Sequence, residues 1–245
     1  MRLTRYESRS KRLSRRVRVA SVADLHDAPY EKLLALLEEA EPDMVAVPGD
    51  FADTPTRREN GLGFLTACAR RYPTFVSLGN HENKSDPQTL LPLLAKTGAE
   101  LLDDRYVRFG ELAVGGLSTG WRAGMRQNRG ETPAPNLSFL AEFAALDAPR
   151  LLLCHHPEYY PRYIKKTSVD WILSGHAHGG QWCLFGHGIF APGQGLFPRY
   201  HAGFYDGRMA QSRGLCRTHR YIPRIANPRE VVLLTLLPAH PDKEG

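Results

Sequence analysis

The stretch SGHAHGGQ at residues 174–181 places two histidines, His176 and His178, one residue apart among three glycines. Four more short clusters contain histidine, aspartate or asparagine: DLH at 24–26, GD at 49–50, GNHE at 79–82 and HH at 155–156. Imidazole nitrogens with carboxylate and amide oxygens, and no thiolate, suit Zn, Mn or Fe better than a soft metal. The candidate residues are Asp24, His26, Asp50, Asn80, His81, His155, His176 and His178.

The number and spacing of these candidates favour two metal ions over one. Asp24 and His26 stand two residues apart, so on an extended segment their side chains point to the same side, and the same holds for His176 and His178. The set is too large for a single tetrahedral ion, whereas two ions can share a carboxylate. Two cations roughly 3.5–4 Å apart can hold a phosphate and activate the water between them. The pattern therefore predicts hydrolysis of a phosphate ester.

Each cluster directly follows a segment that predicts a β-strand. Apolar or alternating runs at 16–23, 43–48, 74–78, 150–154 and 169–173 end at DLH, GD, GNHE, HH and GHAH, respectively. In open α/β sheets the ligand site lies beyond the carboxyl ends of the strands. We therefore expect five separate loops to deliver their polar side chains to one place, which scattered core histidines would not do.

Apolar residues at helical spacing between these strands predict crossover helices and parallel strand pairing. The predicted helices cover residues 30–40, 57–71, 87–97 and 136–146, and further strands cover 100–103, 105–109, 111–117 and 230–237. Gly- and Pro-rich stretches predict a loop at 118–135 and hairpins and loops at 182–207. We expect a single domain over residues 1–245, with a basic N-terminal segment at 1–16 and a tail at 238–245.

The composition is that of a globular protein, with 42% hydrophobic and 24% charged residues. No apolar run approaches the roughly 20 residues that span a bilayer, and no apolar segment of a secretory signal follows the basic N-terminus. We therefore expect a cytoplasmic protein. The cysteines are widely spaced and form no CxxC pair, which predicts reduced, mostly buried thiols. They are Cys68, Cys154, Cys183 and Cys216.

The net charge of +6 is concentrated at the N-terminus, where residues 1–18 hold eight Lys or Arg and one acidic residue. The favoured interpretation is a solvated edge strand, since basic side chains prevent edge-to-edge pairing of sheets. The second interpretation is an electrostatic contact of residues 2–18 with anionic lipid or, with less support, nucleic acid. No obligate protein partner is evident.

Taken in order, DLH, GD, GNHE, His155 and GHAH resemble the motifs of the calcineurin-like metallophosphoesterase superfamily. The resemblance covers roughly residues 17–237 and implies a four-layer αββα sandwich of two mixed β-sheets flanked by helices. SGHAHGGQ, the SRGL segment at 212–215 and PRIANPREVVLLTL at 223–236 are similar to one bacterial branch. That branch contains small phosphodiesterases and UDP-2,3-diacylglucosamine pyrophosphatase-like enzymes.

The resemblance also implies a role for each candidate residue. One metal would be held by Asp24, His26 and His178, the other by Asn80, His155 and His176, and Asp50 would bridge both. The metals would be divalent Mn, Fe, Zn or Mg, with Mn favoured, and a hydroxide bridging them would attack phosphorus. His81 matches a histidine that is not a ligand and that donates a proton or stabilises charge on the phosphoryl or leaving group.

Four residues near these motifs have two interpretations each. Arg213 could bind a substrate phosphate bidentately, although a packing or surface arginine is the favoured interpretation. Asp53 could hydrogen-bond a ligand histidine or cap the 57–71 helix, and Glu82 could support the site in the same way. We expect His156 to point away from its neighbour His155, either behind the ligands or into solvent.

We expect the protein to hydrolyse a small-molecule or lipid-headgroup phosphodiester. The alternatives are a pyrophosphatase acting on a nucleotide-sugar lipid precursor and a non-catalytic scaffold of the same fold. A protein phosphatase is disfavoured, because GDFADT lacks the GDxVDRG pattern and SLGNHE lacks the RGNHE pattern of serine/threonine phosphatases. A nuclease is disfavoured because no added DNA-binding domain is visible.

Overall fold

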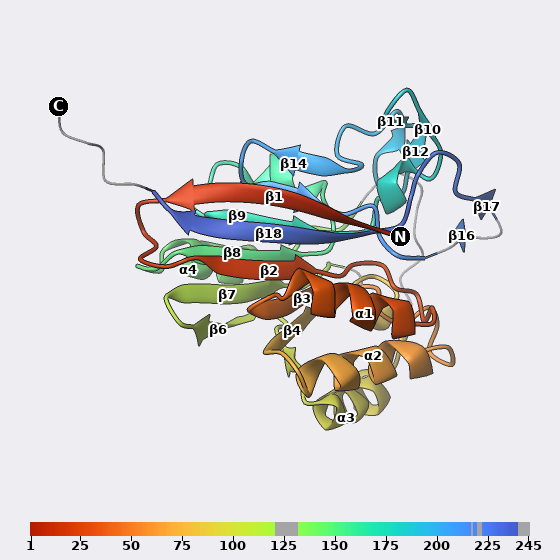
Figure 1. Cartoon of the computed structure of the whole chain (residues 1–245), viewed down its shortest axis with the longest axis horizontal. Coiled ribbons are helices and arrows are strands. Elements are labelled where there is room, and N and C mark those ends of the chain that lie inside the picture. The colour runs from red at the N-terminus through yellow and green to blue at the C-terminus, as the bar shows by residue number, and fades with distance from the viewer. Residues whose placement is uncertain (121–131, 217, 220–221, 240–245) are drawn as a thin grey trace.

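The computed structural model describes residues 1–120, 132–216, 218–219 and 222–239. Two six-stranded sheets dominate the fold and pack face to face (Figure 1). In spatial order, the first sheet contains β1 (Arg2–Ser10), β18 (Glu230–Pro238), β2 (Val17–Ser21), β3 (Met44–Pro48), β4 (Thr74–Ser77) and β5 (Glu100–Leu101). The second contains β14 (Gly203–Tyr205), β15 (Met209–Gln211), β9 (Trp171–Ser174), β8 (Arg150–Cys154), β7 (Leu112–Leu117) and β6 (Arg105–Phe109).

Both sheets are mixed, as the family resemblance implies. In the first sheet β2, β3, β4 and β5 run parallel, and β18 pairs antiparallel with β2. In the second sheet β7, β8, β9 and β15 run parallel, while β6 and β14 join antiparallel at the two edges. The parallel strands bring their carboxyl ends to one edge of each sheet, and the polar clusters lie directly beyond them.

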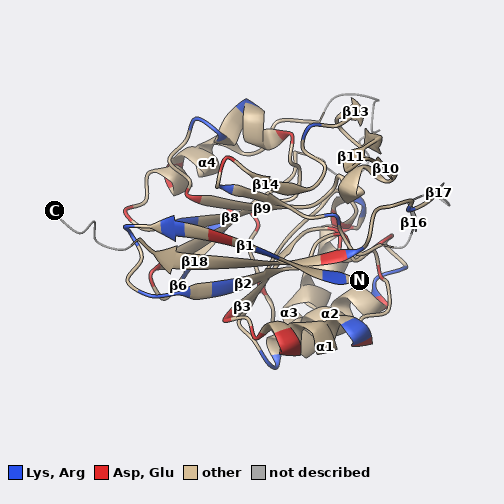
Figure 2. Cartoon of the chain, turned by 45° about the horizontal axis from the view of Figure 1, so that its top comes forward, with Lys and Arg blue, Asp and Glu red and all other residues tan. Residues whose placement is uncertain are grey.

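Helices cover the outer face of each sheet and complete the four layers. The helices are α1 (Glu31–Ala40), α2 (Glu59–Ala69), α3 (Pro87–Thr97) and α4 (Leu137–Ala144), with short helical turns η1 (Glu82–Lys84), η2 (Tyr160–Ile164) and η3 (His178–Gly180). Figure 2 shows α1, α2 and α3 on one side of the sandwich and α4 on the opposite side. The fold class expected from the sequence is therefore confirmed.

Strand β3 shows why the sandwich has a core on both sides of the first sheet. Its alternate residues Val45 and Val47 pack in the cluster under the helices, which includes Leu37 of α1. Met44 and Ala46 point the other way, into the cluster between the sheets. Successive side chains of a strand point to opposite faces, so a strand buried on both faces is apolar throughout. A third cluster packs α4 and η2 against the second sheet.

The basic N-terminal segment forms the edge strand β1, as the favoured interpretation predicted. It pairs in parallel with β18 from Arg2 opposite Glu230 to Ser10 opposite Pro238. Its side chains alternate largely between exposed and half-buried, and Figure 2 shows Lys and Arg along it. The buried Glu230 accepts hydrogen bonds from Arg2 and from Thr4 Oγ1, which lies 2.7 Å from Glu230 Oε2.

Other sequence predictions hold with small shifts of their ends. The predicted strand at 100–103 is shortened to β5, and the predicted helix at 57–71 begins at Glu59, because Thr54 and Arg57 form an isolated β-bridge. The 182–207 region contains the hairpins β10 (Cys183–Leu184) with β11 (His187–Gly188), and β12 (Phe190–Ala191) with β13 (Gly195–Leu196). One further hairpin pairs β16 (Thr218–His219) with β17 (Ile222–Pro223).

Parts of two sequence predictions lie outside the described residues: 121–131 of the 118–135 loop, and 240–245 of the 238–245 tail. Among the helices that the structure describes, none combines the length and apolar character needed to cross a membrane.

The four cysteines are buried and unpaired, as expected. Burial raises the pKa of Cys68 to about 12 and that of Cys154 further, so both thiols stay protonated in the folded protein well above the pH at which a free thiol ionises.

We therefore expect a thiol reagent at pH 8 to label the native protein slowly and to label all four cysteines once a denaturant unfolds it. In the unfolded chain the thiols regain the ordinary pKa of a free cysteine. The free energy of unfolding therefore falls as the pH rises above that ordinary pKa. The absorbance of the chromophore that the reagent releases measures the labelling rate of the native and of the unfolded protein. Labelling of Cys68 in the native protein as fast as in denaturant would contradict its burial.

Candidate metal centre

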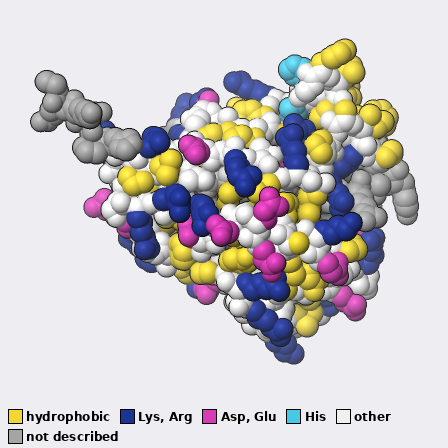
Figure 3. Space-filling model, viewed as in Figure 1, with side chains coloured by type: hydrophobic (Ala, Val, Ile, Leu, Met, Phe, Trp, Pro, Cys, Tyr) yellow, Lys and Arg dark blue, Asp and Glu magenta, His cyan; other side chains and the backbone are white. Residues whose placement is uncertain are grey.

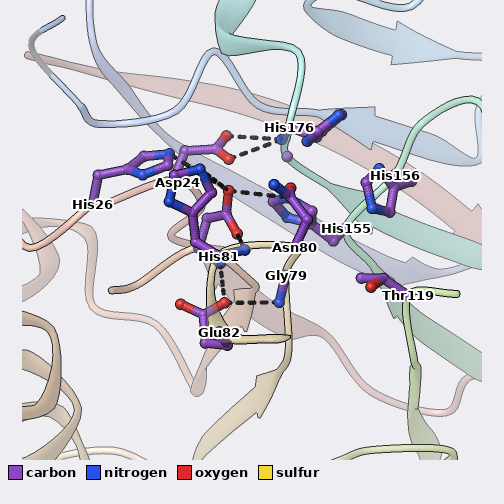
Figure 4. Close-up of polar contacts among 12 residues, drawn as sticks. Asp24, His26, Gly79, Asn80, His81, Glu82, Thr119, His155, His156 and His176 are labelled. Carbon is purple, nitrogen blue, oxygen red and sulfur yellow. Dashed lines mark hydrogen bonds and ion pairs between the residues drawn. The ribbon is translucent and has the colours of Figure 1, made fainter. Parts of the chain in front are cut away.

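All eight candidate residues from the five sequence clusters lie together beyond the strand ends. Figure 4 labels Asp24, His26, Asn80, His81, His155 and His176. The carboxylate of Asp50 is at their centre. Asp50 Oδ2 lies 3.3 Å from His155 Nε2 and 3.5 Å from His26 Nε2. His155 Nε2 is also 3.1 Å from Asn80 Oδ1. Two loops of the first sheet and one of the second thus meet at a single carboxylate.

The DLH and GHAH loops are joined on the other side of the centre. The backbone N–H of His176 donates to both carboxylate oxygens of Asp24, at 2.9 and 3.0 Å. The rings of His26 and His178 lie 5.1 Å apart between centroids. A Cβ atom on Gly175 would come within 2.9 Å of Asp24 Oδ2, so this loop needs glycine in order to approach the carboxylate.

Five of the seven predicted metal ligands have a left-handed backbone conformation. Their φ values are 53° for Asp24, 47° for His26, 55° for Asp50, 69° for His176 and 48° for His178. This conformation costs roughly 1–2 kcal/mol for each residue other than glycine. Such strain gathers where the surrounding structure fixes residues for a function. The turns at the strand ends therefore aim the side chains at the expense of local stability.

The buried carboxylates and imidazoles are strongly coupled. Burial raises the pKa of Asp24, with the His155 imidazole opposing the effect. Burial would also raise the pKa of Asp50, but the imidazoles of His155, His81 and His26 hold it well below its usual value. Burial would lower the pKa of His155, but the Asp50 carboxylate raises it to about 10. The Asp50 carboxylate thus favours positive charge on the groups around it.

The donor groups fit two divalent cations. Asp24, His26 and Asp50 can bring one ligand atom each within 4.8 Å of one another, and so can Asp50, His155 and His176. The two groups share Asp50, the residue that the family resemblance gives as the bridging ligand. His26 Nε2 is buried and has no hydrogen-bond partner among the described residues, which leaves it available to a cation.

His81 lies at the rim of the centre. Its Nδ1 lies 2.5 Å from the carbonyl oxygen of Asp53 and must donate to it, because a carbonyl only accepts. Its Nε2 is 4.0 Å from Asp50 Oδ2, and its side chain keeps 17% of its surface exposed. Burial lowers the pKa of His81. This arrangement is compatible with the predicted non-ligand role.

Glu82 is the main support of the GD and GNHE loops. Its Oε2 accepts the backbone N–H groups of Asp50 and Gly79, and its Oε1 accepts that of Ala52, each at 2.8 Å. Burial and the nearby Asp50 carboxylate raise the pKa of Glu82 to about 7, although the three N–H groups oppose this. Gly79 must be glycine, because a Cβ there would lie 2.1 Å from Asp50 Oδ1.

Asp53 and Arg213 are held by neighbouring side chains. Asp53 Oδ1 lies 3.6 Å from His26 Nδ1, and Asp53 Oδ2 lies 2.6 Å from Arg57 Nη1. Asp53 does not cap the second helix, because the N-cap residue of α2 is Arg58. Arg213 donates from Nη1 to Asn227 Oδ1 at 3.2 Å, and its Nε lies 3.7 Å from Glu230 Oε2. These contacts agree with the packing interpretation of Arg213.

His156 is fully buried, so its solvent-exposed alternative is wrong. Its ring lies 4.2 Å from that of His176, and its Nδ1 is 3.3 Å from Glu158 Oε1. Glu158 also accepts from Thr132 Oγ1 at 2.6 Å. The sequence analysis did not select Glu158; the only signal available in the sequence was an acidic residue three positions after the predicted ligand His155.

Cys216 is the second residue that the sequence analysis missed. Its Sγ lies 3.0 Å from His178 Nδ1 and 3.4 Å from Arg224 Nη2. A ligand atom of Cys216 also groups with those of His26 and His178. The sequence analysis named no thiol among the candidate ligands, so this contact was not expected. A histidine ligand usually donates its second ring N–H to an oxygen, and here a sulfur takes that place.

Comparison with known proteins gives a consistent result. Residues 17–180 match the family described as calcineurin-like phosphoesterase. An uncharacterized metallophosphoesterase of Campylobacter jejuni is 30% identical over 227 residues, which cover 87% of this chain and 55% of the relative. One from Helicobacter pylori is 24% identical over 247 residues, covering 93% of this chain and 61% of the relative. The chain thus spans little more than half the length of these relatives.

Two solved structures share the fold. A putative 5'-nucleotidase from Staphylococcus aureus superposes with a TM-score of 0.53 at 13% identity, over 89% of this chain and 54% of the other. A 5'-nucleotidase precursor from Thermus thermophilus gives a TM-score of 0.51 at 16% identity, over 91% and 54%. At such identities the likeness concerns the fold alone.

Replacing Glu82 by glutamine should loosen the centre, because the amide nitrogen cannot accept a backbone N–H. We expect a loss of about 1–3 kcal/mol in the free energy of unfolding and roughly 10–100-fold weaker metal binding. Urea unfolding and metal analysis measure the two effects. Glu38→Gln, on the exposed face of α1, is the matched control and should change neither. Equal results for both variants would contradict the supporting role of Glu82.

Replacing Cys216 by alanine removes the sulfur that faces His178. We expect one of two metals to bind roughly 10–100-fold more weakly, with partial recovery in Cys216→Ser. Cys183→Ser is the control, since Cys183 is also a buried thiol beside an arginine. The spectrum of the cobalt-loaded protein tells whether the sulfur is itself a ligand, which gives charge-transfer absorption, or a hydrogen-bond partner. Unchanged metal binding in Cys216→Ala would rule out both roles.

Proposed function

The chain belongs to the calcineurin-like phosphoesterase family, and we propose that it is a metal-dependent phosphohydrolase acting on phosphodiesters. The observation that carries the proposal is the pair of ligand groups that share the Asp50 carboxylate. Two divalent cations, of which we favour manganese, would be held there by the seven predicted ligands. When bound, they would neutralise the charge of a phosphoryl group and supply a nucleophile at neutral pH.

The protein's own residues would position the substrate and move a proton. His81 is fixed by the bond from its Nδ1 to the Asp53 carbonyl, and its Nε2 points toward the centre. It is thus placed to exchange a proton with the oxygen of the leaving group. Asp50 is fixed by two hydrogen bonds. Its Oδ1 accepts the His81 backbone N–H at 2.9 Å, and its backbone N–H donates to the Glu82 carboxylate.

Preference for a diester is the finer part of the proposal, supported by the resemblance to the bacterial branch with small phosphodiesterases. Two alternatives are tested by the same substrate screen. One is a pyrophosphatase of nucleotide-sugar lipid precursors, and the other is a nucleoside monophosphatase, the activity named for the two structural neighbours. A non-catalytic scaffold would bind metal without turning over any of these substrates.

Purified protein with Mn²⁺ should hydrolyse bis-p-nitrophenyl phosphate, a chelator should abolish the reaction, and added Mn²⁺ should restore it. His178→Ala should lose metal and activity together. His81→Asn should keep both metals, while kcat falls by about 10²–10⁴, because only a proton-transfer group is removed.

His187→Asn, on the exposed hairpin strand β11, is the control and should retain metal and rate. Metal-loaded, folded protein that turns over no phosphodiester, pyrophosphate or monoester would leave the scaffold as the correct interpretation. Loss of metal in His81→Asn would instead make His81 a ligand.

A further inference from the structure

Large apolar side chains gather on the surface of the two hairpins that follow η3. Seven of the ten exposed large hydrophobic residues in the described part of the chain lie between positions 182 and 225. We call them the hairpin surface: Trp182, Leu184, Phe185, Phe190, Leu196, Phe197 and Ile225. Figure 3 shows the apolar side chains at this end of the molecule. An exposed apolar patch of this kind marks an interaction site.

Two residues of the hairpin surface combine exposure with backbone strain. Phe185 is 92% exposed with φ 49°, and Phe197 is 72% exposed with φ 50°. A large side chain rarely adopts this left-handed conformation, for which glycine or asparagine is suited. Neither phenylalanine gains much from packing inside the protein. Both therefore reduce solubility and local stability, which points to a function outside the protein's own core.

The turn of the first hairpin stands clear of the body, whereas the turn of the second packs on it, where a Cβ on Gly193 would lie 2.2 Å from Glu158 Oε1. Gly186, next to Phe185, and Gly195, next to Leu196, have no other atom within 4 Å of the place where a Cβ would stand. Projecting aromatic and aliphatic tips can enter a soft apolar phase, whereas a folded partner would need pockets shaped to receive them. Trp and Phe beside Arg are the side chains found on surfaces that lie in a membrane interface.

The charge of this region favours an anionic surface. Residues 182–205, which include both hairpins, contain one arginine, Arg199, and no acidic residue. Arg199 is exposed and follows Phe197 by two positions. Basic residues near an anionic bilayer each add to binding, and the contribution adds to that of buried apolar area. The hairpin surface has both components.

The hairpin surface is attached directly to the metal centre. Ile189, between the two hairpins, donates its backbone N–H to the carbonyl oxygen of Gly180 at 3.2 Å and to that of Trp182 at 2.8 Å. Gly180 ends η3, the turn that begins with the predicted ligand His178. A surface that held the hairpins would therefore lie beside the turn that carries His178.

We propose that the hairpin surface inserts into the interface of an anionic lipid bilayer, with Phe185 and Phe197 as the main inserting side chains. Docking in this way brings the metal centre to the level of the lipid headgroups. The docking is inferred from the exposed surface alone. The further step, in which headgroup phosphodiesters reach the metals, depends on the proposed function.

The test is sedimentation of the protein with vesicles of phosphatidylcholine alone and with added phosphatidylglycerol. We expect binding to the anionic vesicles. The double variant Phe185→Asn/Phe197→Asn should bind roughly tenfold or more weakly, because two inserting side chains are lost. Its melting temperature should not fall, because asparagine accepts the left-handed conformation. Leu91→Gln/Leu137→Gln, which removes two exposed leucines of α3 and α4, should bind like the unaltered protein.

Two results would overturn the proposal. One is equal vesicle binding by the unaltered protein and the double asparagine variant. The other is a dimer in lipid-free buffer that the same substitutions dissociate, together with no vesicle binding, which would assign the surface to a second copy of this chain. Vesicle binding needs no turnover, so a protein that binds vesicles but hydrolyses no phosphate ester would refute the proposed function and leave the docking intact.

Discussion

The carboxylate of Asp50 is almost completely buried, and the imidazoles of His26, His81 and His155 surround it. A buried negative charge is costly unless it is paired, so the surrounding loops have to bring positive charge or hydrogen-bond donors to it. The chain meets this requirement with His26, His81 and His155, which come from three separate loops. Glu82 fixes the backbone on which Asp50 stands, and Gly79 leaves room for the carboxylate. Without these contacts Asp50 would not be held in place as the residue that the two predicted ligand groups share.

The strand ends explain why so many ligands have strained backbones. A left-handed residue two or three positions after the end of a strand turns the chain sharply and directs the next side chains across the edge of the sheet. Asp24 and Asp50 do this in the first sheet, and His176 does so in the second. The sandwich core compensates for their strain, because β3 is apolar and buried on both faces and β2 and β9 are buried along almost their whole length. The free energy gained by packing the middle of the strands thus offsets the backbone strain at their ends.

The sequence was informative where one local segment contains both a strand and the polar residues that follow it. GNHE after 74–78 and GHAH after 169–173 are of this type, and their residues meet as expected. The contact of Cys216 with His178 could not be predicted, because it joins positions 38 residues apart across two short hairpins and the strands β14 and β15. The exposure of Phe185 was equally hidden, since aromatic residues in loops more often pack inside than project.

Strand β18 has a consequence for how the protein forms. It lies between β1 and β2, so the two N-terminal strands have no direct pairing and depend on residues 230–238 to join them. The Asp24 carbonyl also accepts the backbone N–H groups of Leu215 and Cys216. During synthesis residues up to 238 must therefore leave the ribosome before the loop of Asp24 can close. The ligands between Asp24 and His178 are thus made well before the strand that completes their scaffold, and a cation meets the complete centre only once β18 is in place.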